Sequence, residues 1–191
     1  GVFDVDNDGQ LDIVSGGFWY KGPDFREKRE VGPMGKYGEY LDAFSEIPLD
    51  IDGDGYLDFV GGGWWGCATR WWKNPNGAAK PEDRNKQWVE TKIADIGCVE
   101  TTRAWDFDGD GVIEIFPNTP GERKVRLFKL IRDAKGKGTG KFSEHVVYEF
   151  PEGQSQGHGH GAGDIAGNGR MDIVLRNGWL EAPANPLGGE Q

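Results

Sequence analysis

The nine residues from Asp50 to Asp58 place oxygen atoms at regular intervals, as a hard divalent cation requires. Carboxylates fall at positions 1, 3, 5 and 9 of this DIDGDGYLD segment, and the backbone carbonyl of Tyr56 is available at position 7. Gly55 at position 6 permits the sharp turn that lets one short loop surround an ion, and Ca²⁺ accepts such a flexible shell of oxygen ligands. An EF-hand would need a Glu at position 12, which is Gly61 here, and helices on both sides. We therefore expect a calcium-binding loop that joins two strands.

The same pattern begins again at Asp4, Asp106 and Asp164, so that the four loops start roughly 50 residues apart. The first and third loops keep their carboxylates, whereas the fourth has Ala166 at position 3 and Asn168 at position 5, so we expect weak calcium binding there or none. The expected ligands are Asp4, Asp6, Asp8, Gln10 and Asp12; Asp50, Asp52, Asp54, Tyr56 and Asp58; Asp106, Asp108, Asp110, Val112 and Glu114; and Asp164, Asn168 and Asp172.

A second candidate for chemistry is the Gly-His-Gly-His segment before the fourth loop. His158 and His160 are two residues apart, so on a strand their rings lie on one face. Asp42 and Glu46 precede the second loop, and Glu100 precedes the third loop, at distances along the sequence similar to those between the histidines and the fourth loop. If these side chains converge, they could hold a transition metal or act as an acid–base pair on a sugar. The alternative is that the histidines only form hydrogen bonds with the backbone of a neighbouring repeat.

Eight tryptophans in 191 residues require an explanation, and Trp64, Trp65, Trp71 and Trp72 fall close together in the second repeat. Large flat side chains can fill the space between neighbouring sheets. The glycines beside them also leave room for a planar ligand such as a sugar ring, with Arg103 as a further polar contact. Packing and ligand binding are both open for this set.

The elements that position these residues are predicted to be short strands, because apolar and aromatic residues alternate with turn residues. We expect an outer hairpin or a long connection over 21–40 and an exposed basic hairpin tip over 133–141. Strands are expected at 43–49, 57–65, 69–73 and 88–93, and at 101–105, 113–116, 125–131 and 144–150.

The four loops resemble the D-x-D-x-D-G-x-x-D calcium loops of FG-GAP and VCBS repeats, which build β-propellers. The resemblance covers nearly the whole chain and implies an all-β fold in which 1–191 is a partial β-propeller with repeats at approximately 1–41, 42–97, 98–155 and 156–191. Three to four blades of a propeller that is seven-bladed when complete are expected. In this family the innermost strand precedes the loop, which would place the loops on one face and the histidines at the mouth on the other.

The resemblance implies a calcium-stabilised module of a secreted, periplasmic or cell-surface protein that binds a carbohydrate or a protein at the propeller mouth. Its other partners would be the remaining blades and a further domain of the same chain. The alternative is a carbohydrate lyase or dehydratase with His158, His160, Glu46 and Glu100 at the mouth. The segment is somewhat similar to the propeller domains of polysaccharide lyases and of aldos-2-ulose dehydratase.

Charge and cysteine content limit the remaining options. The net charge of −10 argues against nucleic acid, whose phosphates require a basic surface. There is no apolar run long enough to span a bilayer. Cys67 and Cys98 are the two cysteines, and either a disulfide or two reduced thiols is compatible with the sequence.

Overall fold

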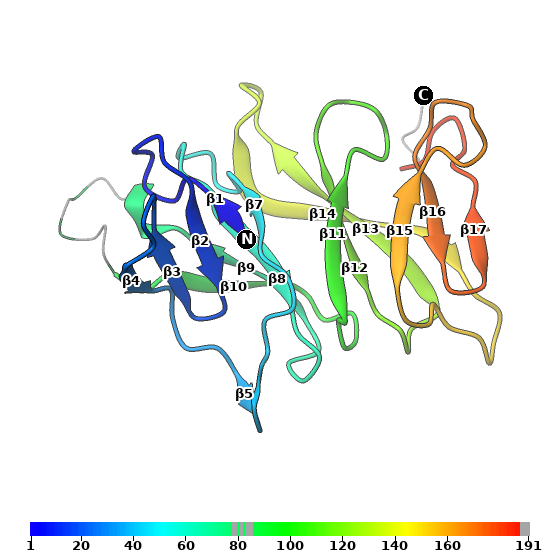
Figure 1. The fold of residues 1–191 in the computed structure, drawn as a ribbon. Coiled ribbons are helices and arrows are strands. Elements are labelled where there is room, and N and C mark those ends of the chain that lie inside the picture. Colours follow the sequence, from blue (N-terminus) through cyan, green and yellow to red (C-terminus); the bar gives the residue numbers. More distant parts are fainter. Residues whose placement is uncertain (78–79, 81, 83–85, 188–191) are drawn as a thin grey trace.

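The computed structural model describes residues 1–77, 80, 82 and 86–187, and this part of the chain consists almost entirely of antiparallel β-sheets (Figure 1). Helical structure in the described residues is limited to a 3₁₀ turn, Pro75–Gly77, and a 3₁₀ assignment at Glu82. The prediction of an all-β fold is therefore confirmed.

Four sheets follow one another along the chain, each built from strands that pair with their sequence neighbours. The first contains β1 (Val2–Phe3), β2 (Asp12–Ser15), β3 (Phe18–Lys21) and β4 (Glu27–Glu30). The second contains β7 (Ile47–Leu49), β8 (Asp58–Gly62), β9 (Thr69–Lys73) and β10 (Val89–Ala94). The third contains β11 (Thr101–Trp105), β12 (Glu114–Asn118), β13 (Lys124–Arg132) and β14 (Gly138–Glu149). The fourth contains β15 (His160–Gly163), β16 (Asp172–Leu175) and β17 (Gly178–Leu180).

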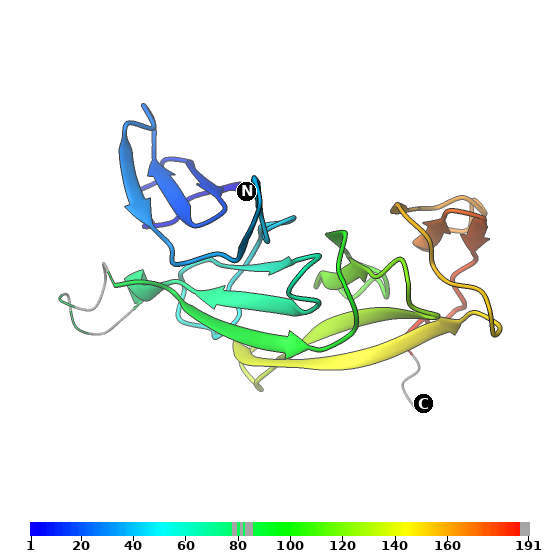
Figure 2. The ribbon, with the colours of Figure 1, turned by 90° about the horizontal axis from the view of Figure 1, so that it is seen from below.

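Each acidic loop joins the first and second strands of its sheet, so all four loops lie at the same end of the molecule. This is the upper end in Figure 1, and the segments that enter each first strand lie at the opposite, lower end. Seen from below in Figure 2, the sheets stand side by side along an arc. The expected separation of the loops from the histidines is therefore observed.

Side chains between consecutive sheets form three hydrophobic clusters, which hold the sheets face to face. Trp72 packs with the first sheet and stacks on Phe59 at a ring separation of 4.8 Å. Its neighbour Trp71 packs on the opposite face, among residues of the third sheet. Adjacent residues of a strand point to opposite faces, so both rings are buried only because the second sheet is covered on both sides. Of the two alternatives for Trp71 and Trp72, the structure shows packing, because both rings are buried in the core.

The predicted exposed hairpin tip is confirmed over 133–137, whereas the remainder of 133–141 belongs to β14, which already begins at Gly138. Gly138 is buried, and the Gly140 N–H donates a hydrogen bond to the Ile51 carbonyl at 2.8 Å. The ammonium of Lys137 donates to the Gly53 carbonyl at 3.1 Å. The long β13–β14 hairpin of the third sheet thus rests on the acidic loop of the second.

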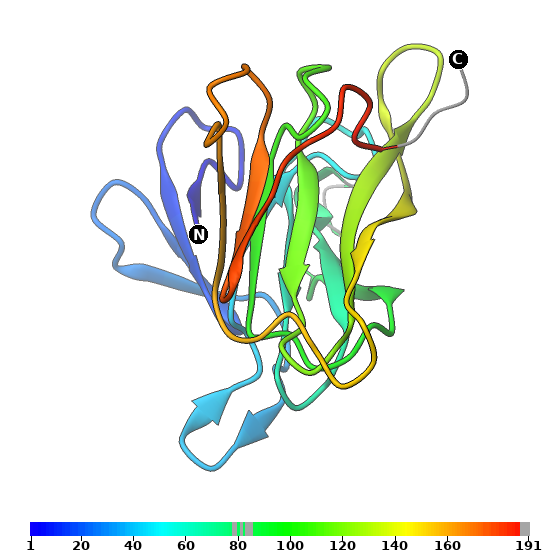
Figure 3. The ribbon, with the colours of Figure 1, turned by 90° about the vertical axis from the view of Figure 1, so that its right-hand side faces the viewer.

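The segment 21–40 contains β4 and then a separate two-stranded hairpin, β5 (Lys36–Tyr37) and β6 (Tyr40–Leu41). This hairpin projects from the lower end of the molecule (Figure 3). Tyr40 is 64% exposed, and one face of the Tyr37 ring stacks on Trp65 at 5.0 Å. The hairpin therefore adds aromatic side chains to the end that carries the histidines.

Candidate functional site

All four acidic loops share one framework of hydrogen bonds, which explains why the sequence folds the same way four times. The carboxylate at position 1 accepts two backbone N–H groups of its own loop, as Asp50 does from Gly53 at 2.9 Å and from Gly55 at 3.1 Å. Asp164 does the same in the fourth loop, with Asn168 at 2.9 Å and Gly169 at 2.8 Å. This framework turns the remaining carboxylates of the loop toward one another.

The carboxylate at position 9 connects the loop to the sheet. Asp58 accepts the Ile51 N–H at 3.0 Å and the Asn74 N–H at 2.7 Å, which joins the start of the loop to the end of β9. Asp12 and Asp172 form the equivalent pairs of bonds. These three carboxylates are therefore structural before any ligand is considered.

Carboxylate oxygens converge in the first three loops, where three atoms in each group lie within 4.8 Å of one another. The groups are Asp4, Asp6 and Asp8; Asp50, Asp52 and Asp58; and Asp106, Asp108 and Glu114. The remaining expected ligands include the position 7 residues Gln10, Tyr56 and Val112. The backbone N–H of each donates a hydrogen bond to the position 5 carboxylate of its own loop. The fourth loop does not form such a group among the described residues, because Ala166 and Asn168 replace two of its carboxylates.

Glu114 combines complete burial with an oxygen atom that forms no hydrogen bond within the described part of the chain. It is fully buried, its Oε2 accepts the Phe107 N–H at 2.8 Å, and its Oε1 has no hydrogen-bond partner in the described structure. Burial raises its pKa to about 7, and burial likewise raises the pKa of Asp58 to about 7. Buried Oδ1 atoms of Asp6 and Asp52 also lack partners among the described residues. A divalent ion would satisfy these oxygens, so the residues fit calcium.

A lysine from the third strand of each of the first three sheets reaches the acidic loop of that sheet, which the sequence analysis missed. Lys21 contacts Asp6 and Asp8, Lys73 contacts Asp52 and Asp54, and Lys129 contacts Asp108, Asp110 and Glu114. The available signal was a lysine after two large apolar or aromatic residues in each of the first three repeats: Trp19-Tyr20-Lys21, Trp71-Trp72-Lys73 and Leu127-Phe128-Lys129.

At the lower end, the loop after β8 presents Trp64 to solvent. Asp42 is 4% exposed and accepts the backbone N–H groups of Trp65 at 3.0 Å and of Gly66 at 2.7 Å. A disulfide joins Cys67 in this loop to Cys98 before β11. The loop is thus fixed from two directions, while Trp64 remains 37% exposed. Trp64 and Trp65 follow the end of β8 at Gly62, whereas the predicted strand ran through both of them.

His158 lies beside this tryptophan. The rings of Trp64 and His158 are stacked with centroids 6.0 Å apart, and His158 Nδ1 lies 2.8 Å from Oε1 of Glu100. Glu100 also accepts the Gly159 N–H at 3.1 Å. The side chains of His158 and Glu100 are 65% and 35% exposed, so both are accessible. We call Trp64, His158 and Glu100 the Trp64 site.

His160 occupies a different environment from His158, contrary to the expectation of a matched pair. Its ring lies 4.2 Å from that of Phe116 and 6.3 Å from that of Trp105, and neither ring nitrogen has a hydrogen-bond partner in the described structure. The pKa of His160 is lowered to about 4, chiefly by burial and next by the positive charge of exposed Arg103, against an opposing effect of Glu100. His160 is therefore a neutral packing residue at neutral pH, and a shared metal site with His158 is not formed in this arrangement.

The other two expected members of the mouth have structural partners. Glu46 accepts the Gly16 N–H at 3.1 Å and so joins the first and second sheets, whereas Asp42 holds the Trp65 loop. A ring of Asp42, Glu46, Glu100, His158 and His160 is therefore not assembled. The structure brings Glu100 and His158 together and assigns Asp42 and Glu46 to the framework.

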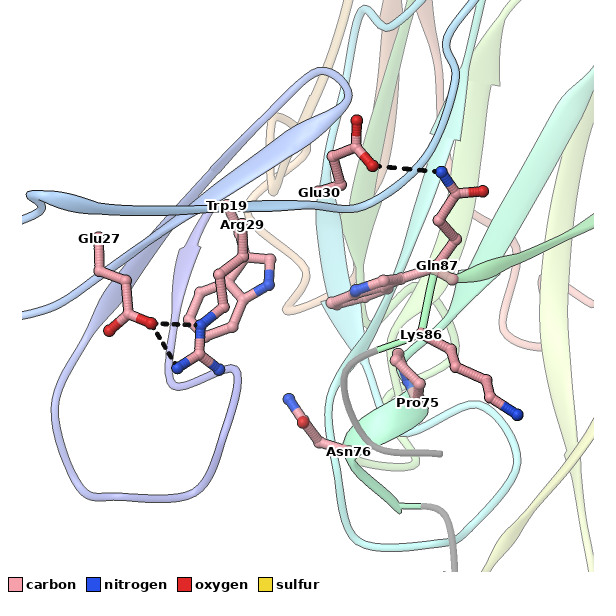
Figure 4. Close-up of a pocket in the computed structure, with 9 residues that line it drawn as sticks. Trp19, Glu27, Arg29, Glu30, Pro75, Asn76, Lys86 and Gln87 are labelled. Atoms are coloured by element: carbon pink, nitrogen blue, oxygen red, sulfur yellow. Dashed lines mark hydrogen bonds and ion pairs between the residues drawn. The ribbon is translucent and has the colours of Figure 1, made fainter. Parts of the chain in front are cut away.

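A cavity of about 480 Å³ lies elsewhere, between the outer parts of the first and second sheets (Figure 4). Glu27 binds Arg29 there, and Gln87 donates to Glu30. Its two tryptophans, Trp19 and Trp88, are only 3% and 6% exposed, so they offer little ring surface to a ligand.

Comparison of the chain with protein-family models, with curated proteins and with solved structures found no match. The fold and the site define an all-β protein of consecutive antiparallel sheets with acidic loops at one end and an aromatic site at the other. In the described residues no helix is long and apolar enough to cross a membrane.

Proposed function

We propose that the chain is a calcium-stabilised β-propeller segment of the FG-GAP/VCBS type that binds a carbohydrate at its lower end. Four successive sheets on an arc, each with its loop between the first two strands, support the propeller. Converging carboxylates with unpartnered buried oxygens support calcium at the first three loops.

The observation that carries the ligand proposal is the exposed Trp64 on a loop that Asp42 and the Cys67–Cys98 disulfide hold in place. An aromatic ring held in this way loses little conformational freedom on binding, and its flat face suits the C–H face of a sugar. His158 and Glu100 supply hydrogen-bonding groups beside it. A protein ligand would use the same residues, and an oxidising location, secreted, periplasmic or at the cell surface, agrees with the disulfide.

Affinity electrophoresis through gels that contain xylan, alginate or homogalacturonan tests this proposal. Wild type is expected to be retarded by at least one polysaccharide, and Trp64→Ala to lose the retardation. Trp179→Ala is the matched control, because Trp179 is 44% exposed on the fourth sheet, away from the Trp64 site. Equal retardation of wild type and Trp64→Ala would exclude this site, and no retardation by any polysaccharide would favour a protein ligand.

A lyase or dehydratase is the second candidate, and the accessible Glu100–His158 pair is the observation that favours it. A carboxylate that orients an imidazole is a common arrangement for a general base, which such enzymes need to remove the proton next to a carboxyl or carbonyl group. Incubation with the same polysaccharides would then produce an unsaturated sugar that absorbs in the ultraviolet. His158→Ala should abolish this product while Trp64→Ala weakens substrate binding.

A further inference from the structure

The three lysines that enter the acidic loops occupy one equivalent place in their sheets. Lys129 pairs with Glu114 in the β12–β13 register. In the first sheet Tyr20 pairs with Ile13, so the next residue, Lys21, lies opposite the position 9 carboxylate, Asp12. In the second sheet Trp72 pairs with Phe59, so Lys73 lies opposite Asp58 in the same way. In each sheet the lysine therefore faces the carboxylate at position 9.

The fourth sheet carries the opposite charge at this place. Leu180 pairs with Ile173, so the next residue, Glu181, is the equivalent of the three lysines. Its loop is the one that has lost the carboxylate at position 3. Glu181 accepts a hydrogen bond from Asn168 at 3.1 Å and lies 3.6 Å from Arg170. The residue opposite position 9 is thus positively charged in the three sheets whose loops are rich in carboxylates, and negatively charged in the fourth sheet, whose loop has fewer carboxylates.

The lysine contacts are made with the carboxylates that a cation would use. In the third loop the Lys129 ammonium lies 2.6 Å from Asp110 and 3.5 Å from the otherwise unpartnered Oε1 of Glu114, and it also contacts Asp108. In the second loop Lys73 lies 3.2 Å from Asp54 and contacts Asp52. An ammonium and a calcium ion cannot both use these oxygens, because the two positive charges would repel each other at such short range.

We propose that Lys21, Lys73 and Lys129 are built-in counter-ions of the acidic loops, and that calcium binds only by displacing them. This inference rests on the proposed calcium sites and adds the residues that set their affinity. Each lysine stabilises the loop without metal and weakens calcium binding, because part of the ion's interaction energy is used to release the ammonium. The fourth loop has no such lysine, in keeping with its smaller acidic charge.

Lys129→Met tests the proposal, because methionine keeps the length and packing of the side chain and removes its charge. Lys124→Met is the matched control, since Lys124 lies on the same strand, whereas the ammonium that contacts the third loop in the described structure is that of Lys129. Calcium titration calorimetry of Lys129→Met is expected to show one site with roughly tenfold higher affinity than in wild type. In excess chelator the same variant should unfold at a lower temperature than wild type and Lys124→Met.

The outcomes separate this inference from the calcium proposal. Equal calcium affinity in wild type and Lys129→Met would overturn the inference and leave the calcium sites in place. Binding by Lys129→Met but not by wild type would support the inference and contradict calcium binding by the natural chain. Binding by neither protein would overturn both.

Discussion

Oε1 of Glu100 lies 2.8 Å from Nδ1 of His158, and this contact joins the segment before the third sheet to the segment before the fourth. The Trp64 ring stacks on the same histidine from the second sheet. Residues from three sheets therefore meet at the lower end, on the side opposite the acidic loops. This separation allows ligand binding and metal-dependent stability to be tested independently.

Glu100→Gln is expected to weaken carbohydrate binding with little effect on stability. The substitution keeps the shape of the side chain and removes the negative charge that orients His158. An exposed pair of this kind contributes about 1 kcal/mol or less to the free energy of unfolding. Urea unfolding and polysaccharide affinity, measured on the same preparations, test both parts. A large loss of stability with unchanged affinity would show that the contact is structural.

His160 is expected to make stability depend on pH between about 6.5 and 4. Its pKa is about 4 in the folded protein and close to 6.5 when unfolded, so the unfolded chain takes up a proton first as the pH falls. The free energy of unfolding therefore decreases through this window, by about 3 kcal/mol in total, and levels off below it. His160→Leu should lack this decrease.

Carboxylates titrate in the same window, so the informative quantity is the difference between wild type and His160→Leu in calcium-containing buffer. His158→Leu serves as the control, because that side chain is 65% exposed. A difference curve for His160→Leu that does not change with pH would contradict the assignment of His160 as a half-buried neutral base.

Asp42→Ala is expected to destabilise the protein and to release the loop that carries Trp64. The substitution leaves the N–H groups of Trp65 and Gly66 without their acceptor, at a cost of about 1–3 kcal/mol for a buried group. Gly63→Ala should have a similar effect, because a Cβ there would lie 2.2 Å from Oδ1 of Asp42. Thermal unfolding would report the loss of stability, and the change in tryptophan fluorescence that is absent when Trp64→Ala is added would report the release of Trp64. Unchanged unfolding of both variants would contradict the role of Asp42.

The repeats could be predicted from the sequence because their determinants are local. A position 1 carboxylate and a glycine at position 6 specify the same turn wherever they occur, and strands such as β9 and β11 have the predicted bounds. Side-chain environments depend on neighbouring sheets, so they were harder to predict. His158 and His160 share a local pattern, yet one faces solvent beside Glu100 and the other packs against Phe116.

The same reason explains the errors at the mouth and the lysines that were overlooked. Asp42 and Glu46 lie at the expected distances along the sequence from the second loop. Their hydrogen-bond partners, Trp65 and Gly16, lie in turns, and sequence spacing does not determine how those turns pack against the two carboxylates. Lys129 enters the third loop because β13 pairs with β12, which is a property of the sheet register. An alignment of the repeats that compares the residues opposite position 9 of each loop would have identified this lysine.

The most direct test of the calcium account is thermal unfolding in excess calcium and in excess EGTA, with the bound metal measured by elemental analysis. We predict bound calcium and a clear fall in melting temperature on chelation, because a site filled at 100 times its dissociation constant contributes roughly 2.7 kcal/mol. Asp50→Ala should reduce this calcium-dependent shift more than Asp164→Ala does. The same melting temperature in both buffers, with no calcium bound, would contradict the account.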